Sequence, residues 1–318
     1  MGIVLVTSRS FSSGSIDEVG RLADAGHTVV TAAPSHDLAE LLGLLHDAVG
    51  WIAGTGAVTR EHLDAAPHLR VIARYGVGVE SVDIAAATEH GIVVTNTPGA
   101  NSDAVADHAV GLMLAILRGT TAGDRRVRAN DWSVQRGREL GALTVGIVGF
   151  GRIGQGVARR LQGFGSRIFA HDPWLSDEAI FKAGVAPRGI PALASECDLV
   201  TLHSPGGVSI VTAEWLALAR PGLVIVNTAR PDLVDEPALA HALRVQSVAG
   251  FAADTLAGDA RGLSSPLLAA DLADRVIVTP HLGAQTVQAV DNMGSMAVSN
   301  LLAVLAGGPP ANPVLTKA

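Results

Sequence analysis

Residues 144–161 read TVGIVGFGRIGQGVARRL, and this stretch decides the fold. Gly149, Gly151 and Gly154 stand in a G-x-G-x-x-G frame between an apolar run and a segment with helical character. Asp172 ends a second apolar run, 18 residues after the last glycine. A glycine frame alone is a weak signal. Strand, glycine turn, helix, strand and acid in this order are the fingerprint of a dinucleotide-binding fold.

Each part of the fingerprint has a mechanical role. Gly149 permits the tight turn, Gly151 lets the backbone approach a pyrophosphate, and Gly154 lets the helix pack close to the strand. The amino end of the helix offers N–H groups and a partial positive charge to the phosphates. Asp172 is suited to accept hydrogen bonds from the adenosine ribose, and its charge disfavours a 2′-phosphate. The predicted cofactor is therefore NAD rather than NADP.

Composition narrows the class of protein. A chain of 318 residues has room for about two domains. Short Val/Ile/Ala runs alternate with Ala/Leu-rich helical patterns, which predicts an α/β fold with buried parallel strands. No apolar run approaches the ~20 residues of a membrane span, and the N-terminal MGIVLVTSRS resembles a strand rather than a signal peptide. The net charge of −7 argues against a nucleic-acid binder.

The single cysteine and the histidines exclude two further classes of site. Cys197 has no partner for a disulfide within the chain, so a cytoplasmic location is expected. It reads as a small core residue rather than a nucleophile. The histidines lack the spacing of the usual metal-binding motifs, and we expect no metal site.

The chain ahead of the glycine fingerprint predicts a separate α/β unit over residues 1–98. The strands expected there cover residues 3–7, 28–32, 49–53, 70–73 and 92–95, with helices between them. The turn Asn96–Gly99 marks a boundary, and a long helix follows from about Ser102 to Leu117.

The second unit repeats the same alternation. Its expected strands cover residues 143–148, 167–171, 198–202, 222–227, 248–253 and 275–278. Six strands make a full dinucleotide-binding sheet. The tail, residues 285–305, reads as one more helix.

Polar residues follow four of these strands. Ligands of open α/β sheets bind beyond the carboxyl ends of the strands, and the strand ends deliver His203, Arg230, Asp254 and His281. Each residue alone is also explained as an ordinary strand-end cap, and for His203 that simpler reading is preferred. For Arg230 and His281 taken together, a functional role is preferred.

Three longer segments carry a resemblance to a known family. They are ARYGVGVESVDIAAATEHGIVVTNTPGANSDAVADHAVGLMLAILR (73–118), VNTARPDLVDEPAL (226–239) and VIVTPHLGAQT (276–286). Together they resemble the D-isomer-specific 2-hydroxyacid dehydrogenase family, which includes D-3-phosphoglycerate dehydrogenase. The resemblance implies two doubly wound parallel-sheet domains. A Rossmann NAD-binding domain, residues 99–285, is inserted into a flavodoxin-like substrate domain of residues 1–98 and 286–318.

The same resemblance assigns the catalytic roles. Arg230 would bind the substrate carboxylate and polarise the carbonyl, and a planar guanidinium suits that task. His281 would give a proton to the carbonyl oxygen during reduction, or take it during oxidation, because hydride transfer builds negative charge there. Asp259 stands where the family has a glutamate that holds the histidine.

The remaining predicted contacts fall into two groups. The cofactor-binding residues are Gly149, Gly151, Arg152, Ile153, Gly154, Asp172, His203, Pro205, Thr228, Ala229 and Asp254. The substrate-binding residues are Arg74, Val77, Gly78 and Asn101. Arg74 resembles an arginine that helps phosphoglycerate dehydrogenases bind the substrate phosphate, but a surface arginine at a strand end is an equal alternative.

Several positions depart from the family pattern. Asp259 is one methylene shorter than the usual glutamate, and a plain loop carboxylate is the alternative. Pro231 replaces a usual glycine after Arg230, which biases that arginine towards extended backbone angles. Gly206 and Gly207 replace a bulkier pair.

The sequence thus predicts an NAD-dependent D-2-hydroxyacid dehydrogenase that acts on a small anionic 2-oxo or 2-hydroxy acid. An NAD(H)-sensing binding protein of the same fold, or a member with poor catalysis, is the alternative. The resemblance also implies a homodimer built around residues 100–140 with Trp132 buried, unless this helix only packs on its own domain.

Overall fold

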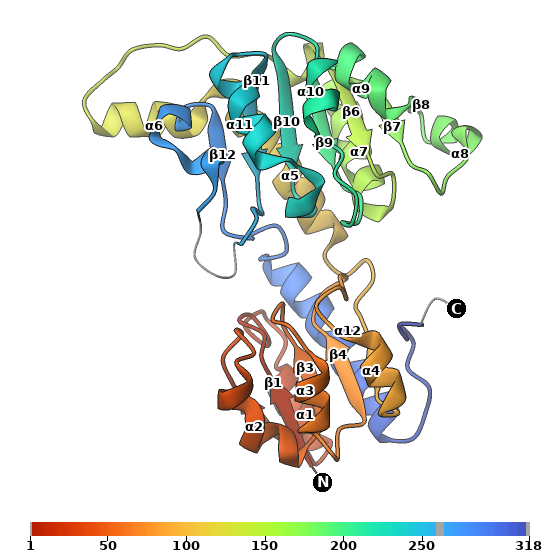
Figure 1. Cartoon of the computed structure of the whole chain (residues 1–318). Helices are drawn as coiled ribbons and strands as arrows, with labels where there is room; N and C mark the ends of the chain where they lie inside the picture. The colour runs from red at the N-terminus through yellow and green to blue at the C-terminus, as the bar shows by residue number, and fades with distance from the viewer. Residues whose placement is uncertain (1, 259–263, 316–318) are drawn as a thin grey trace. The chain divides into compact units, whose positions relative to one another are not determined.

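The computed structural model describes residues 2–258 and 264–315, and it divides the chain into two compact units (Figure 1). Unit 1 contains the residues up to Asn101 and those from Ala284 onward, and unit 2 contains Ser102–Gly283. The chain therefore leaves unit 1 after Asn101, forms unit 2, and returns to unit 1 at Ala284.

Unit 1 is built on a parallel sheet whose strands alternate with helices along the chain. In the described residues the strands are β1 (Ile3–Val6), β2 (Thr28–Thr31), β3 (Ala48–Ala53), β4 (Val71–Arg74) and β5 (Val93–Thr95). The helices between them are α1 (Glu18–Asp24), α2 (Leu38–Asp47), α3 (Arg60–Asp64) and α4 (Ile84–Glu89). The strand order β2-β1-β3-β4-β5 is that of flavodoxin-like folds, as expected.

Local sequence explains where these helices begin. Asp17, Asp37 and Asp83 each precede a helix, and each carboxylate accepts a hydrogen bond from a backbone N–H of the first turn. Such caps satisfy amide groups that have no partner inside the helix. The strands between them are apolar and mostly buried, so the alternation of caps and apolar runs fixes the order of elements.

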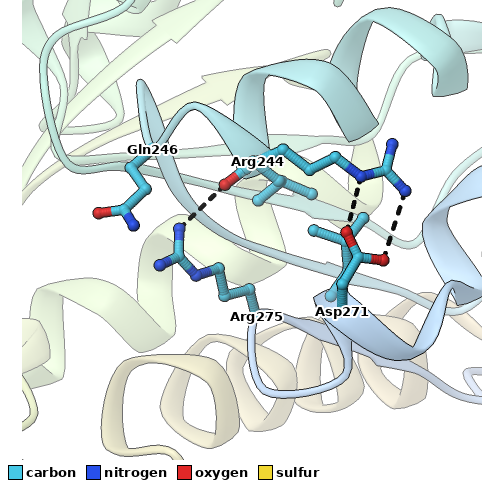
Figure 2. Close-up of a pocket in the computed structure, with 6 residues that line it drawn as sticks. Arg244, Gln246, Asp271 and Arg275 are labelled. Carbon is cyan, nitrogen blue, oxygen red and sulfur yellow. Dashed lines mark hydrogen bonds and ion pairs between the residues drawn. The ribbon is translucent and has the colours of Figure 1, made fainter.

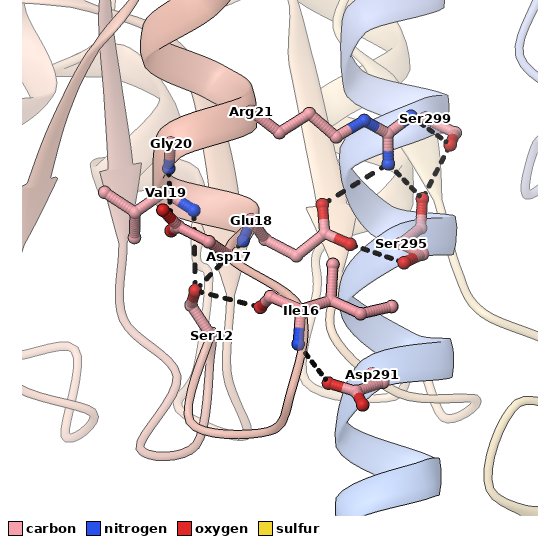
Figure 3. A network of polar contacts seen from close by, with 10 residues as sticks. All are labelled: Ser12, Ile16, Asp17, Glu18, Val19, Gly20, Arg21, Asp291, Ser295 and Ser299. Atoms are coloured by element: carbon pink, nitrogen blue, oxygen red, sulfur yellow. Dashed lines mark hydrogen bonds and ion pairs between the residues drawn. The ribbon is translucent and has the colours of Figure 1, made fainter.

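The C-terminal helix α12 (Val287–Leu305) belongs to unit 1 and packs against β3 and β4. Polar contacts tie it to the segment before α1 (Figure 3). Asp291 accepts hydrogen bonds from the backbone N–H groups of Ser15 (2.9 Å) and Ile16 (3.1 Å). The buried Glu18 accepts one from the Ser295 hydroxyl. These contacts attach the C-terminal helix to the N-terminal part of unit 1.

Unit 2 is also built on a parallel sheet. In the described part of this unit the strands are β6 (Thr144–Val148), β7 (Arg167–His171), β8 (Ala186–Pro187), β9 (Leu199–Leu202), β10 (Leu223–Asn227), β11 (Val248–Ala253) and β12 (Val276–Val278). Their order is β12-β11-β10-β9-β6-β7-β8, the Rossmann order with one strand added at the β12 edge. The expected count of six strands was wrong. Strand β8 was missed because it is only two residues long and lies in no apolar run that would predict a strand.

The helices of unit 2 cover both faces of this sheet. They are α5 (Ser102–Arg118), α6 (Thr120–Arg128), α7 (Arg152–Phe164), α8 (Asp177–Lys182), α9 (Ile190–Glu196), α10 (Ala213–Ala217) and α11 (Glu236–Arg244). Helix α5 packs against α7, β10 and β11. Cys197 is fully buried in the core, and burial raises the pKa of its thiol to about 12, as suits a core residue. Among the described residues, no helix is long and apolar enough to cross a membrane.

Candidate functional site

In the turn after β6, the three glycines differ in how much space surrounds them. Gly149 has a φ of +88°, and a Cβ there would lie 2.6 Å from the backbone of His203. A Cβ on Gly154 would lie 2.1 Å from the Gly149 carbonyl oxygen. Gly151 differs, because a Cβ there meets nothing within 4 Å. Two glycines therefore permit close packing, whereas the third borders open space at the amino end of α7.

Asp172 lies directly after β7, beside this turn. Its carboxylate accepts hydrogen bonds from the backbone N–H of Phe150 (2.7 Å) and of Trp174 (2.9 Å). The acid therefore holds the glycine turn in shape. A carboxylate has about four lone-pair positions, so these two bonds leave capacity for the hydroxyls of a ribose.

Other polar atoms at this edge of the sheet are buried without a partner. In the described part of the chain these atoms are the His203 Nδ1, the Ser204 hydroxyl and the Thr228 hydroxyl. Burial lowers the pKa of His203 to about 3, and its Nε2 lies 2.9 Å from the Thr201 hydroxyl. Buried polar groups are normally hydrogen-bonded. Together with the space at Gly151, these atoms fit a bound dinucleotide.

Arg230 follows β10 in a loop that Asn227 holds. The buried Asn227 donates from Nδ2 to the Arg230 carbonyl (2.8 Å) and accepts the Ala229 N–H at Oδ1 (3.0 Å). The backbone of Arg230 is extended, with φ −133° and ψ 143°, as expected for a residue before proline. Sequence reasoning missed Asn227, although an asparagine at the end of the apolar run LVIV was a visible signal.

The loops that carry the two departures near Arg230 contact one another. Pro231 opens a short 3₁₀ turn, Pro231–Leu233, in which its missing N–H costs nothing. Asp232 of this turn accepts the Gly207 N–H at 2.5 Å. A Cβ on Gly206 would lie 2.6 Å from the same carboxylate. Gly207 is therefore hydrogen-bonded to the turn that Pro231 begins.

The loop that carries His281 is fixed by Asp254. The buried Asp254 carboxylate accepts hydrogen bonds from the backbone N–H of Leu282 (2.8 Å) and Gly283 (2.7 Å) and from the Thr279 hydroxyl (2.5 Å). The His281 N–H donates to the Asp254 carbonyl at 3.1 Å. His281 itself is exposed and has a φ of +58°, a conformation uncommon for non-glycine residues. Asp254 thus stabilises a backbone shape that His281 alone disfavours.

His108 completes this network and was not expected from the sequence. Its Nε2 lies 3.2 Å from Asp254 and 2.9 Å from the Thr279 hydroxyl. Burial opposes ionisation of Asp254, but hydrogen bonds from His108, Thr279 and the two loop amides hold its pKa below the ordinary value. His108 is on α5, far from these residues in sequence, so only the fold brings them together.

Asp259 lies outside the described residues. Glu236 accepts hydrogen bonds from the Ala257 N–H (2.8 Å) and the Ser265 hydroxyl (2.7 Å). Glu236 is itself buried. Ala257 and Ser265 are therefore both fixed to the first turn of α11.

Of the substrate-binding residues predicted in unit 1, Arg74 ends β4, Val77 and Gly78 follow it, and Asn101 follows β5. Arg74 is only 7% exposed, so the reading of it as a surface arginine was wrong. Its guanidinium donates to the carbonyls of Tyr75 (2.7 Å) and Ala53 (3.2 Å). Asn96 donates to the Val77 carbonyl (2.7 Å) and so fixes the loop that leads to Gly78. The Asn101 side-chain oxygen is buried without a partner in the described part of unit 1.

Comparison with known proteins identifies the family. Residues 110–283 match the NAD-binding domain of the D-isomer specific 2-hydroxyacid dehydrogenases. The chain belongs to this family. Unit 2 is thus its NAD-binding domain, in agreement with the glycine fingerprint, the strand order and the predicted cofactor. Among the described residues, no group of three or more metal-ligating side chains is present.

Individual relatives bear different names. The D-3-phosphoglycerate dehydrogenase of Mycobacterium tuberculosis is 40% identical over 255 residues, which are 79% of this chain and 48% of that protein. The glyoxylate reductase of Pyrococcus furiosus is 36% identical over 80% of this chain and 78% of its own. An NAD-dependent formate dehydrogenase from Staphylococcus aureus, solved with NAD, superposes with a TM-score of 0.85 at 27% identity and covers both chains fully (100%). The chain spans about half the length of most of the curated relatives it matches.

Proposed function

We propose that this protein is an oxidoreductase that transfers a hydride between NAD(H) and C2 of a small D-2-hydroxy acid or 2-oxo acid. The observation that carries the proposal is the Asp254 network, which holds His281 at the end of β12 while Asn227 holds Arg230 at the end of β10. Both residues follow strands of the NAD-binding domain, at the edge where ligands of such sheets bind.

The chain's own residues supply binding and proton transfer, and bound NADH supplies the hydride. Arg230 binds the substrate carboxylate through its planar guanidinium and draws electron density from the adjacent carbonyl. His281 donates a proton to the carbonyl oxygen as negative charge develops there, and it accepts that proton in the reverse direction. Asp259 is proposed to support the charged histidine.

The amino end of α7 is proposed to hold the pyrophosphate, through the amides of Arg152 and Ile153 above the open space at Gly151. Asp172 is proposed to bind the adenosine ribose. His203, Pro205, Thr228, Ala229 and Asp254 are proposed to line the same cofactor. The unpartnered atoms of His203 and Thr228 support these assignments.

For the substrate we propose a small 2-oxo acid such as glyoxylate, hydroxypyruvate or 3-phosphohydroxypyruvate. The names of the relatives support this class, since they include a glyoxylate reductase and phosphoglycerate dehydrogenases. Arg74 and the Val77–Gly78 amides are proposed to bind anionic groups of the substrate, together with Asn101. Whether one anionic group or two is bound decides between these candidates.

NADH oxidation against a panel of 2-oxo acids tests the proposal. We expect turnover with at least one member, and His281→Ala should abolish it while the NADH affinity stays near that of the wild type. Tight NADH binding without turnover on any acid would refute the enzyme and favour an NAD(H)-sensing protein. A large loss of NADH binding in the variant would place His281 in a structural role.

We also propose a homodimer in the cytoplasm. Trp132 and Val134 follow α6 and are 75% and 96% exposed in the single chain, which favours their burial by a second copy. The single cysteine supports a reducing compartment. Light scattering after size-exclusion chromatography should give twice the chain mass, and Trp132→Ser should shift it towards the monomer. A monomeric wild type would contradict the dimer.

A further inference from the structure

The C-terminal segment of residues 311–314 lies along the edge strand β5 of unit 1. The Val314 N–H donates to the Val94 carbonyl at 2.8 Å, and Pro313 forms an antiparallel bridge with Thr95. The Val314 side chain also packs against the core of this unit. The segment therefore adds an antiparallel bridge to the edge of an otherwise parallel sheet and covers that edge.

Asn300 of α12 holds this segment to the end of β5. Its side chain is buried, and its Oδ1 accepts the N–H groups of Ala311 (3.2 Å) and Asn312 (3.3 Å). Its Nδ2 donates to the Asn96 carbonyl (3.2 Å) and to the Asn312 Oδ1 (3.3 Å). These bonds use every hydrogen-bonding position of one amide side chain. Since the Asn96 N–H also donates to the Asn312 carbonyl at 3.3 Å, both backbone groups of Asn96 are bound by this assembly.

Asn96 in turn holds the loop that leads to Gly78. Its Nδ2 donates to the Val77 carbonyl at 2.7 Å, and the N–H of the next residue, Thr97, donates to the Gly76 carbonyl at 3.0 Å. The Val77 side chain is 40% exposed, so packing holds this loop only weakly. The shape of the loop therefore depends on the hydrogen bonds that Asn96 and Thr97 make with it.

We propose that Asn300 is a positioning residue for the substrate, because it couples the docking of segment 311–314, through Asn96, to the shape of the Val77–Gly78 loop. The inference rests on the proposed function, in which the amides of this loop bind an anionic group of the acid. A loop that already has its binding shape loses less conformational entropy when the ligand arrives. Undocking of the segment from β5 should therefore weaken binding of the acid without any change at the residues of hydride transfer.

Arg70 provides a matched comparison for a purely structural role. Its guanidinium donates to the Val304 (3.0 Å) and Leu305 (2.9 Å) carbonyls at the end of α12. It thus secures the same helix as Asn300, but these bonds do not involve Asn96. Loss of the Arg70 side chain should lower the melting temperature alone, whereas loss of the Asn300 side chain should also weaken binding of the acid.

Hydrogen exchange on the whole protein tests the coupling without any turnover. A peptide covering residues 93–98 contains the Thr97 amide, which is bonded to Gly76 of the loop. Asn300→Ala should speed its exchange at least about tenfold while peptides of β1 keep the wild-type rate. Asn312→Ala removes one of the four bonds, so it should fold and give a smaller change in the same direction. Unchanged exchange in both variants, or equal acceleration in β1, would overturn the proposal.

Steady-state kinetics with the best acid of the panel test the consequence for the substrate. Asn300→Ala and Asn96→Ala should each raise KM about five- to tenfold, with kcat within about twofold and NADH affinity unchanged. Because both act through one path, the double variant should be no worse than the larger single effect. Arg70→Gln should leave KM unchanged, as should Arg244→Gln, which breaks an exposed ion pair of unit 2 with Asp271 (2.7 Å, Figure 2).

Two kinetic results would contradict the coupling. One is a rise in KM for Arg70→Gln equal to that for Asn300→Ala, and the other is full additivity in the double variant. If the wild type reduces no acid, the proposed function fails, and the exchange experiment still decides whether Asn300 positions the loop.

Discussion

Asp254→Asn should impair catalysis, because the change removes hydrogen bonds that fix the His281 loop. In the wild type, one oxygen accepts from Thr279 and Leu282 and the other accepts from Gly283 at 2.7 Å. An asparagine keeps only one accepting oxygen, so its NH₂ group must face one of these donors. At best the Gly283 bond is lost and its buried N–H is left unpaired. A hydrogen bond to a charged group contributes about 1.5–3 kcal/mol.

At about 1.4 kcal/mol per tenfold, this loss predicts a fall of about 10- to 100-fold in kcat/KM. The assay is NADH oxidation with the best acid of the panel. A melting curve should show unit 2 destabilised by roughly 2 kcal/mol, or about 4–8 °C. Asp235→Asn is the matched control, since Asp235 caps α11 from an exposed position and asparagine caps equally well. An Asp254→Asn protein with kcat/KM within threefold of the wild type would refute the reasoning.

Three further changes test His108 in the same network, the glycine turn, and a buried histidine of unit 1. His108→Leu should lower kcat/KM about 3- to 10-fold, since it removes one partly exposed partner of Asp254, and His108→Gln should restore most of it; equal loss in both would contradict a hydrogen-bonding role. Gly151→Ala should keep the melting temperature of the wild type but bind NADH at least tenfold more weakly. Gly154→Ala should instead lower the melting temperature, because a Cβ at Gly154 meets backbone atoms whereas one at Gly151 does not. Titration calorimetry and melting curves separate the two effects. Burial lowers the pKa of His36 to about 4, so the unfolded chain binds a proton at a higher pH than the folded protein does. The free energy of unfolding of unit 1 should therefore fall by up to about 3 kcal/mol as the pH falls from 6.5 to 4. Melting curves across this pH range should show a smaller loss for His36→Asn, since asparagine tolerates the φ of +57°.

The sequence predicted the parts of the molecule that local patterns specify. Apart from β8, apolar runs placed the strands of both units to within one or two residues, because buried parallel strands have strong local signals. Strand β8 was not predicted, since a two-residue strand that is defined only by its pairing in the sheet leaves no pattern in the sequence. The glycine turn was predictable because steric needs at Gly149 and Gly154 exclude other residues.

What the sequence lacked was the set of contacts between elements distant along the chain. His108 meets Asp254 across 146 positions of sequence, and no spacing rule connects them. For Arg74 the sequence left a surface arginine as an equal alternative to a substrate-binding one, and only the fold shows it buried against the Ala53 and Tyr75 carbonyls. Residues that act directly on a ligand carry motifs, whereas those that hold them in place depend on tertiary packing.

One hydrogen bond links the two loops that carry the departures from the family pattern near Arg230. Pro231 begins a 3₁₀ turn, and this turn places the Asp232 carboxylate on the Gly207 amide at 2.5 Å. A Cβ at Gly206 would lie 2.6 Å from this carboxylate, so a side chain there would make the exposed Asp232 side chain move. We therefore expect a change at Gly206 to act on the loop that begins at Arg230. Gly206→Ala, by pushing Asp232 away, should change the ranking of acids in the panel more than it changes NADH affinity.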